Sequence, residues 1–333
     1  MHLFNRQSSG GVRRTSRRAA AAGCRRWLLL ALGAAALLSA IAIRWGPCPD
    51  VRRAPLPASF AVTDASGGML RQVLAADGSD CRPVALVDRE SWIARAVVAA
   101  EDKRFWRHPG IDPLALLRAL GQNLRGRRVV SGASTLSTLV IRLTHPPCRR
   151  SVPVKVREYF QALQIDARLA KEEILTQYLN RAPFGGNVVG IQAASRRYFD
   201  KDWSELSLAE AALLAGLPQS PSYLRPDRHP RRAVKRRAYV LGRMLKLNLI
   251  SPSEYESACA APVVCRRQAA PFKAPHAVAS AITEAMARPP TLDGGRLATT
   301  IDPALQAAAE AALRERVDEI GRAHASAGAV MVL

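Results

Sequence analysis

The feature that most constrains this chain is an uncharged apolar run near its N-terminus. Residues 27–43 read WLLLALGAAALLSAIAI, seventeen positions without a charge, with an arginine and a second tryptophan directly after them. The segment before the run holds seven arginines and no acidic residue. At about 1.5 Å per residue, a helix of this length just crosses about 30 Å of hydrocarbon. The run therefore predicts one membrane-spanning helix.

The flanking charges predict how that helix is oriented. Arginines on the N-terminal side keep the tail of residues 1–26 in the cytoplasm, so the chain after an anchor at residues 27–45 lies on the outer face of the membrane. A cleaved signal peptide and a buried core helix are the alternatives. The only small-residue pair that suits cleavage, Ala40 and Ala42, lies inside the apolar run, which favours an uncleaved anchor.

Charge and composition narrow the class of protein. The chain of 333 residues carries 49 Lys and Arg against 27 Asp and Glu, a formal net charge of +22. With 48% hydrophobic and 23% charged residues, it fits neither a disordered chain nor a polytopic membrane protein. The basic surface favours anionic partners. Because no nucleic-acid-binding motif accompanies the charge, we expect no nucleic acid among them.

The six cysteines do not indicate a metal site. They show no C-x-x-C spacing and no paired Cys/His pattern. Five of them follow the predicted span and would face an oxidising compartment, where Cys259 and Cys265 are close enough in sequence to form a disulfide. Free buried thiols are the equal alternative.

Hydrophobic periodicity divides the rest of the chain. Prolines after the span predict a stalk, and two turn signals after it predict a small hairpin within residues 46–87. From residue 88 to residue 250 the apolar spacing is helical, which predicts a mainly α domain. Helices are expected at 90–103, 112–124, 134–144, 154–170, 172–181, 187–198, 205–217 and 230–248. Residues 251–333 are expected to be a linker, with a connector at 262–300, a helix at 303–320 and the first strand of a truncated further domain at 326–333.

The densest group of reactive side chains spans residues 101–110, which read EDKRFWRHPG. The preceding helix must end here because His108 comes before a proline. A carboxylate at such an edge, beside aromatic rings that exclude water, suits general-base catalysis because partial desolvation raises its pKa. A charged helix end without a catalytic role is the alternative.

Three further groups place polar residues at helix ends or turns. Residues 131–138, SGASTLST, form either an N-cap or a phosphate-binding helix start. Lys155 and Glu158 are neighbours at i, i+3, away from an apolar stripe through Val156, Phe160 and Leu163; they form either a solvated ion pair or a site for pyrophosphate and its metal ion. Residues 180–187, NRAPFGGN, form either an ordinary turn between helices or a glycine turn that a ligand approaches closely.

Taken together and in this order, the four groups resemble the glycosyltransferase domain of class A penicillin-binding proteins, most of all the penicillin-binding protein 1C branch. The pattern E-D-x-x-F-x-x-H-x-G is complete at 101–110, G-x-S-T lies at 132–135 and K-x-x-E at 155–158. The resemblance covers residues of about 60 to 250, and more weakly 295–333. The chain contains no S-x-x-K, S-x-N or K-T-G, so we expect no transpeptidase activity and no penicillin binding.

The resemblance implies a fold, a reaction and a set of site residues. The fold would be a lysozyme-like α domain behind the anchor, and the reaction the polymerisation of lipid II into glycan strands by inverting displacement of polyprenyl pyrophosphate. Glu101 would be the general base, and Glu158 a second catalytic residue and the ligand of a divalent cation, Mg²⁺. The substrate-binding residues would be Asp102, Phe105, His108, Gly132, Ser134, Thr135, Lys155, Arg157, Asn180, Gly185, Gly186 and Asn187.

The same resemblance implies location and partners. The catalytic domain would lie on the periplasmic side of the inner membrane, in contact with its lipids, the growing glycan strand and other cell-wall synthesis proteins. Two positions depart from the family pattern: Leu139 stands where a glutamine is usual, and Val154 where a basic residue usually precedes the K-x-x-E lysine. These departures, with the abrupt end of the chain, favour the alternative of a weak or inactive scaffold of the cell-wall synthesis complex.

Overall fold

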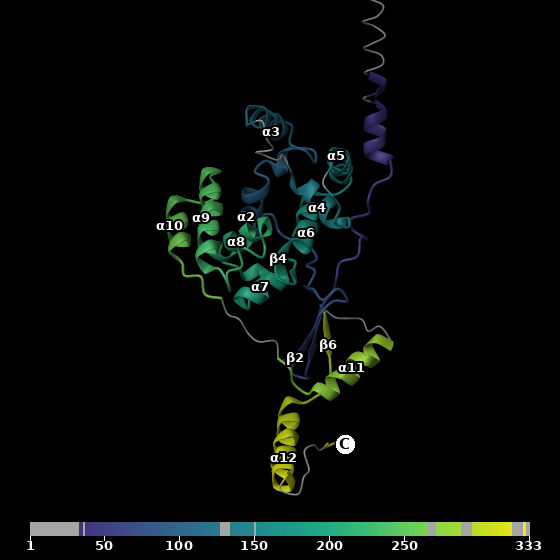
Figure 1. The fold of residues 1–333 in the computed structure, drawn as a ribbon, viewed down its shortest axis with the longest axis vertical. Coiled ribbons are helices and arrows are strands. Elements are labelled where there is room, and N and C mark those ends of the chain that lie inside the picture. Colours follow the sequence, from purple (N-terminus) through teal and green to yellow (C-terminus); the bar gives the residue numbers. More distant parts are fainter. Residues whose placement is uncertain are drawn as a thin grey trace, which may run out of the picture.

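The computed structural model describes residues 33–35, 37–126, 134–149, 151–265, 271–287, 295–321 and 329–330 (Figure 1). Most of the described chain is helical, as predicted. A helical body comes first, a small sheet lies beside it, and two further helices lie beyond the sheet. The helices of the body are α2 (Trp92–Glu101), α3 (Pro113–Gly126), α4 (Leu136–Thr144), α5 (Val152–Asp166), α6 (Lys171–Arg181), α7 (Ile191–Phe199), α8 (Leu208–Gly216), α9 (Pro230–Lys246) and α10 (Pro252–Ala260).

The core of the body forms around α8, which packs against α2 and α9. The sequence of α8, LAEAALLAG, is apolar on nearly every side, and such a helix is stable only when it is surrounded. A capping box fixes its start: the Ser207 side chain accepts from the Glu210 N–H, and the Glu210 carboxylate accepts from the Ser207 N–H. Helix α2, buried at seven positions, covers one side of α8.

Two small sheets accompany the helices. The first has the strand order β2-β1-β6, in which β1 (Phe60–Thr63) pairs antiparallel with β2 (Met69–Val73) and parallel with β6 (Arg296–Ala298). The second has the order β3-β5-β4, from Asp80–Cys81, Val188–Val189 and Pro183–Gly185. The hairpin predicted within residues 46–87 is confirmed by the antiparallel pair of β1 and β2. Three turns of 3-10 helix complete the body, η1 (Phe105–Arg107), η2 (Trp203–Glu205) and η3 (Leu217–Gln219).

The C-terminal part differs from the prediction at residues 262–300, and of the strand predicted at 326–333 only residues 329–330 are described, which are not in a strand. Residues 262–300 were expected to be a connector, but they contain α11 (Pro275–Ala287) and strand β6. Val278 of α11 packs with Val62 and Leu70 of the first sheet, so these elements exist because of contacts with residues about 200 positions earlier. Helix α12 (Pro303–Gly321) is close to the predicted 303–320, and α10 begins two residues beyond the domain boundary expected at 250 and packs on α9 and α8.

The helix boundaries within the body agree closely with the periodicity at most ends, with two corrections. The helix predicted at 154–170 is α5, which ends at Asp166. The helix predicted at 187–198 begins only at Ile191, because strands β4 and β5 occupy the residues before it.

The described cysteines are all free thiols: Cys48, Cys81, Cys148, Cys259 and Cys265. Cys259 and Cys265 therefore do not form a disulfide.

The predicted anchor falls only partly on described residues. Residues 33–35 and 37–45 are helical, whereas the basic tail and positions 27–32 and 36 lie outside the described residues. Among the described helices, none is both long and apolar enough to span a bilayer. The end of the N-terminal helix contacts α5 and the turn after it: Gln164 Nε2 donates to Ala42 O at 2.9 Å and Arg168 donates to Gly46 O at 2.6 Å.

Candidate active site

Glu101 is the last residue of α2 and lies half-buried between helices. Two arginines of α9 donate to backbone carbonyl oxygens of the helices packed against it. Arg243 donates to Ala100 O of α2 at 3.0 Å, and Arg236 donates to Gly216 O of α8 at 3.2 Å. Burial raises the pKa of the Glu101 carboxyl, and the positive charges of Arg236 and Arg243 partly oppose that rise. A carboxylate with a raised pKa beside fixed cations is the electrostatic setting expected of a general base.

Asp102, next to Glu101, connects three parts of the body. Its carboxylate, 5% exposed, accepts the backbone N–H of Leu136 at 3.0 Å, at the first turn of α4. It also lies 3.0 Å from Nε2 of His108, and because a carboxylate only accepts, that nitrogen carries the hydrogen. The Nδ1 atom of His108 is buried without a hydrogen-bond partner. Asp102 and His108 are thus close together but buried, and their contacts hold α2, η1 and α4 in place.

Phe105 and a lysine that the sequence analysis missed lie on the same side of the body. Phe105 is fully buried, and the Lys171 ammonium stands over its ring at 4.7 Å. Lys171 Nζ also donates to His108 O and to Asp166 Oδ1, each at 2.6 Å. The aromatic residue therefore belongs to the core, and Lys171 ties the loop after α2 to α6.

The second predicted group begins α4. Thr135 is the N-cap and forms a capping box with Thr138, and its hydroxyl donates to Gly110 O at 2.6 Å. The N-cap alternative is thus the one observed for Thr135, which is 1% exposed. Ser134 is half-exposed, and Gly132 lies outside the described residues. Leu139, at the position where the family pattern has glutamine, packs partly buried against the core.

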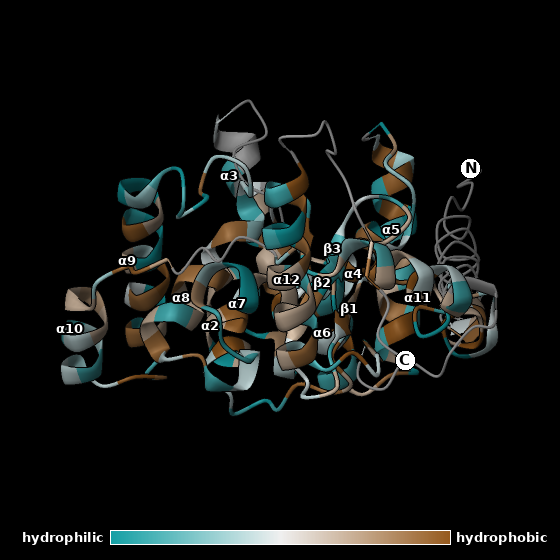
Figure 2. Ribbon diagram, turned by 90° about the horizontal axis from the view of Figure 1, so that it is seen from below, coloured by the Kyte–Doolittle hydropathy of each residue, from teal (hydrophilic) through white to brown (hydrophobic). Residues whose placement is uncertain are grey.

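The third group lies on α5, and its acidic residue pairs with an arginine of α4. Hydrophobic residues are spread along α5 (brown in Figure 2), and two residues of the stripe noted in the sequence, Val156 and Phe160, are exposed. Glu158 instead points toward α4, where Arg142 donates to both of its carboxylate oxygens, at 3.3 and 3.1 Å. Lys155 and Arg157 are both exposed.

A cavity of about 410 Å³ lies between α4 and α5, and we call it the α4–α5 pocket. Arg142, Arg157 and Glu158 supply its charged lining, and the rest is mainly apolar. Glu101 is not among the residues that line this pocket. The structure therefore brings Glu158 together with two guanidinium groups but does not bring both predicted catalytic carboxylates into this cavity.

The fourth group is a turn with a structural role. The Asn180 amide, 3% exposed, pairs with both the N–H and the C=O of Val84, each at 2.9 Å. Gly185, the last residue of β4, and Gly186, in the turn to β5, have φ of +110° and +62°. The Asn187 amide donates to Gly78 O at 2.9 Å. All four residues thus contribute to the join between the second sheet and the body, and their substrate-binding role stays a prediction.

Among the described residues, no group of three or more His, Cys, Asp and Glu side chains is arranged to hold a metal ion. The carboxylate expected to bind Mg²⁺, that of Glu158, is already paired on both oxygens by Arg142. A divalent ion there would have to displace a guanidinium. The described residues around Glu158 therefore do not fit a metal ion held by the protein.

Comparison with known proteins identifies the family. A model described as Transglycosylase matches residues 68–245, more than half of the chain. The chain belongs to the transglycosylase family. Penicillin-binding protein 1C of Escherichia coli is 44% identical over 200 residues, 60% of this chain and 26% of that protein. A Cupriavidus necator protein named as a transglycosylase is 40% identical over 187 residues, 56% of this chain and 80% of that protein.

This transglycosylase chain spans about a quarter of the length of the penicillin-binding proteins that it matches, and no transpeptidase region is among the matches. The crystal structure of penicillin-binding protein 1A from Haemophilus influenzae aligns with 80% of this chain and 31% of its own, at 23% identity and a TM-score of 0.42.

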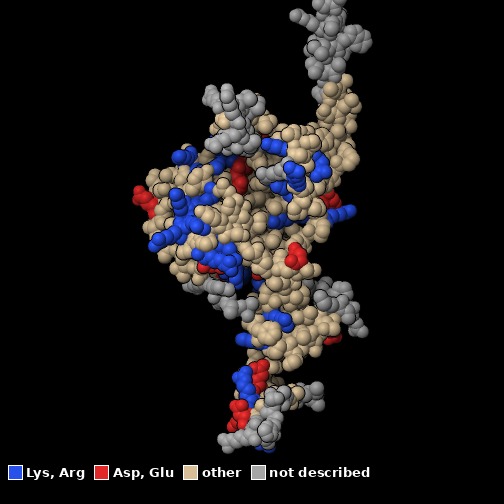
Figure 3. Space-filling view, viewed as in Figure 1, with Lys and Arg blue, Asp and Glu red and all other residues tan. Residues whose placement is uncertain are grey.

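The cations beside Glu101 and Glu158 were not predicted from the sequence: Arg236 and Arg243 lie near Glu101, and Arg142 pairs with Glu158. Arg236 and Arg243 lie seven positions apart on α9, a spacing that puts them on one face of a helix and could have been noticed. That this face is turned toward Glu101 depends on how α9 packs on α2. Basic side chains form several separate patches on the face of the helical body shown in Figure 3, where acidic side chains are fewer.

Proposed function

We propose that this chain is a membrane-anchored peptidoglycan glycosyltransferase that polymerises lipid II, with Glu101 as its general base. The observation that carries the proposal is the environment of Glu101: a carboxylate at the end of α2, desolvated enough for burial to raise its pKa, with Arg236 and Arg243 nearby. The family match supports the reaction class. A lysozyme-like arrangement of the helices is part of the proposal.

The reaction needs one base and a means of stabilising the leaving group. Glu101 would accept the proton of the 4-hydroxyl of the incoming sugar while that oxygen attacks the anomeric carbon of the growing strand. The bond from that carbon to the pyrophosphate oxygen breaks, and the configuration inverts. A general base in this position contributes a factor of about 10² to 10⁴.

The departing pyrophosphate carries negative charge that must be stabilised. Arg157 and Arg142 line the α4–α5 pocket beside Glu158, and Lys155 is exposed on the same helix as Arg157. Fixed cations of this kind stabilise charge that develops on the leaving group. Glu158 then acts through Arg142: it holds that guanidinium in one orientation, so we assign it a positioning role in place of direct metal binding.

Exposed apolar residues favour contact with the inner membrane. Helix α3 exposes Leu114, Leu116 and Leu117, and α5 exposes Val156 and Phe160. Both helices lie at the end of the body from which the N-terminal helix projects (Figure 1). Apolar side chains at that end would enter the lipid interface while basic residues contact anionic headgroups, which would bring the site to a lipid-linked substrate.

A second candidate is a scaffold that binds the cell-wall synthesis complex without turnover. The observation that favours it is Leu139, an apolar side chain packed against the core at the position where the family pattern has an amide.

Glycan synthesis from labelled lipid II by the detergent-solubilised chain tests both candidates. Glu101→Gln keeps the shape and removes the basic group, so polymer formation should fall by at least about a hundredfold. Glu90→Gln, at an exposed acid of the same body, is the matched control and should keep normal activity. Full activity in Glu101→Gln would refute the proposed base, and no polymer from the unmodified chain would favour the scaffold.

A further inference from the structure

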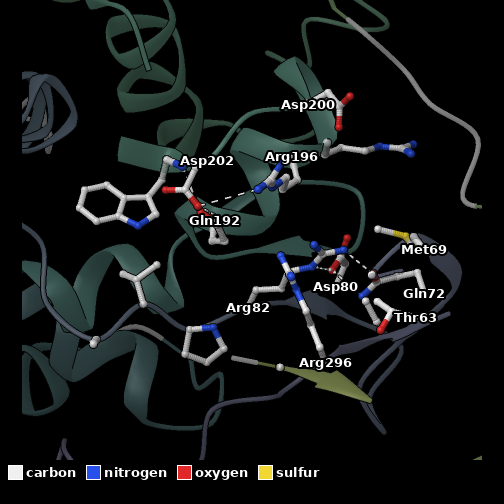
Figure 4. Close-up of a pocket in the computed structure, with 18 of the residues that line it drawn as sticks. Thr63, Met69, Gln72, Asp80, Arg82, Gln192, Arg196, Asp200, Asp202 and Arg296 are labelled. Atoms are coloured by element: carbon white, nitrogen blue, oxygen red, sulfur yellow. Dashed lines mark hydrogen bonds and ion pairs between the residues drawn. The ribbon is translucent and has the colours of Figure 1, made fainter. Parts of the chain in front are cut away.

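A second cavity, of about 640 Å³, lies between the first sheet and α7 (Figure 4). Four arginines line it, and we call it the arginine pocket: Arg82 follows β3, Arg196 and Arg197 belong to α7, and Arg296 begins β6. The proposed glycosyl transfer uses none of them. The four side chains come from three separate elements, so only the folded chain brings them together.

Two of these guanidinium groups have partners within the pocket: Arg196 lies 3.9 Å from a carboxylate oxygen of Asp202, and Arg82 donates to the side-chain oxygen of Gln72. Nε of Arg82 is buried without a hydrogen-bond partner, and the nearest carboxylate oxygen, on Asp80, is 3.7 Å away. That oxygen already accepts from the Ser59 hydroxyl at 2.9 Å. Burial lowers the pKa of Arg82; the Asp80 carboxylate partly opposes that change, and the charges of Arg196 and Arg296 add to it. Converging like charges with an unused buried donor favour an anionic ligand.

The balance of charge in the lining indicates how much negative charge the ligand carries. Three aspartates, Asp80, Asp200 and Asp202, also line the pocket, so its four arginines leave one net positive charge. A single carboxylate matches that balance, whereas a phosphate dianion would leave an excess of negative charge. Guanidinium groups pair with a carboxylate in a bidentate geometry.

The rest of the lining and the location of the pocket indicate the kind of molecule. Met69, Leu86 and Trp203 give it apolar surface that could cover a short peptide. The first sheet lies beyond the helical body from the end that carries the N-terminal helix (Figure 1). The pocket is therefore remote from the proposed membrane contact, which favours a water-soluble ligand over a lipid headgroup.

We propose that the arginine pocket binds the carboxylate of a peptide through Arg82, Arg196 and Arg296. The further identification of that peptide as the stem peptide of the nascent glycan strand rests on the proposed function. In that case the pocket would hold the polymer by its peptide, away from the site of sugar transfer.

Equilibrium binding of defined peptides to the solubilised full chain tests the inference. The probe is a dye-labelled alanine tetrapeptide with a free C-terminal carboxylate, followed by fluorescence anisotropy at low salt, and the same peptide with a C-terminal amide is its neutral control. A hydrogen bond between charged partners is worth about 1.5–3 kcal/mol, so the amide should bind about tenfold or more weakly.

Variants of the arginines locate the binding site. Arg296→Gln and Arg82→Gln should each raise the Kd of the carboxylate peptide about tenfold or more. Arg296 is exposed and has little packing to lose, so that variant remains informative if Arg82→Gln fails to fold. Arg53→Gln removes the same charge from a side chain that is 90% exposed and outside the pocket, and should leave the Kd unchanged.

Three results would overturn the inference: equal binding of carboxylate and amide, equal weakening by Arg53→Gln and Arg296→Gln, or displacement of the peptide by inorganic phosphate at lower concentration than by acetate. Lipid II polymerisation by the unmodified chain is measured separately. Peptide binding without polymerisation would refute the proposed function and keep the pocket assignment. Polymerisation without peptide binding would refute the pocket alone.

Discussion

Replacing Asp102 with alanine removes an acceptor that two buried donors share. The Leu136 N–H, 3.0 Å from one carboxylate oxygen, belongs to the first turn of α4 and would have no other acceptor in the observed contacts. The Nε2–H of His108, also 3.0 Å away, would lose its partner as well. A substitution at one position thus affects α2, η1 and α4 together.

The expected cost follows from the number of donors left unpaired. A buried donor without a partner costs about 1–3 kcal/mol, so two donors cost about 4 kcal/mol. A domain of this size is stable by only about 5–15 kcal/mol, so the loss is a large fraction of the total. At about 2–4 °C per kcal/mol, the melting temperature should fall by roughly 8–16 °C.

Urea unfolding followed by circular dichroism measures this loss. Asp102→Asn keeps one acceptor oxygen and should lose about half as much stability. Asp88→Ala is the matched control, because Asp88 accepts one backbone N–H, that of Glu90 at 3.0 Å, in an exposed turn and should cost under about 1 kcal/mol. The reasoning is refuted if Asp102→Ala is as stable as Asp88→Ala, and loss of glycan synthesis without loss of stability would instead favour the substrate-binding role.

The other predictions concern Gly185, Arg142 and Glu101. A Cβ on Gly185 would lie 2.7 Å from Arg225 Cγ, whereas Gly67, which also has a positive φ, has open space around it. Gly185→Ala should therefore lower the free energy of unfolding by about 3 kcal/mol, and the control Gly67→Ala by about 1 kcal/mol. Equal losses for the two variants in urea titrations would contradict the predicted clash. Arg142→Gln leaves the Glu158 carboxylate, 12% exposed, without its partner, so this variant should lower the free energy of unfolding by about 3 kcal/mol. In a double-mutant cycle, the variant Arg142→Gln/Glu158→Gln should recover part of that loss. Burial raises the pKa of Glu101 in the folded state, so the contribution of this group to stability is present below its unfolded pKa and is lost as the pH rises through its folded pKa. Glu101→Gln should flatten that part of the plot of unfolding free energy against pH. An unchanged plot would contradict the burial of Glu101.

Much of the helical body could be predicted because helix formation depends on neighbours three and four residues away. The periodicity placed α2, α6 and α9 to within about two residues at most ends, and side chains such as Ser207 mark the helix starts by local hydrogen bonds. Strand β6 and α11 could not be predicted in this way. Their partners, β1 and β2, lie more than 200 residues earlier, and no local pattern records such a pairing.

The candidate site shows the same division. The spacing of Glu101 and Asp102 at a helix end was evident from the sequence, but not which carboxylate would be held by hydrogen bonds. The structure gives Asp102 two donors and leaves Glu101 desolvated beside α9. The apolar stripe of α5 was evident from the sequence, but not that Val156 and Phe160 in it would be exposed, because a stripe alone does not distinguish a core from a lipid surface.

The sequence by itself determined the helices of the body, the hairpin and the family motifs, because each depends on residues close together in the chain. Only the tertiary structure decided which acid is desolvated, that Arg142 pairs with Glu158, and that four arginines from three elements line one pocket. Burial and charge pairing depend on distance in space, and packing brings together residues that the linear order keeps far apart.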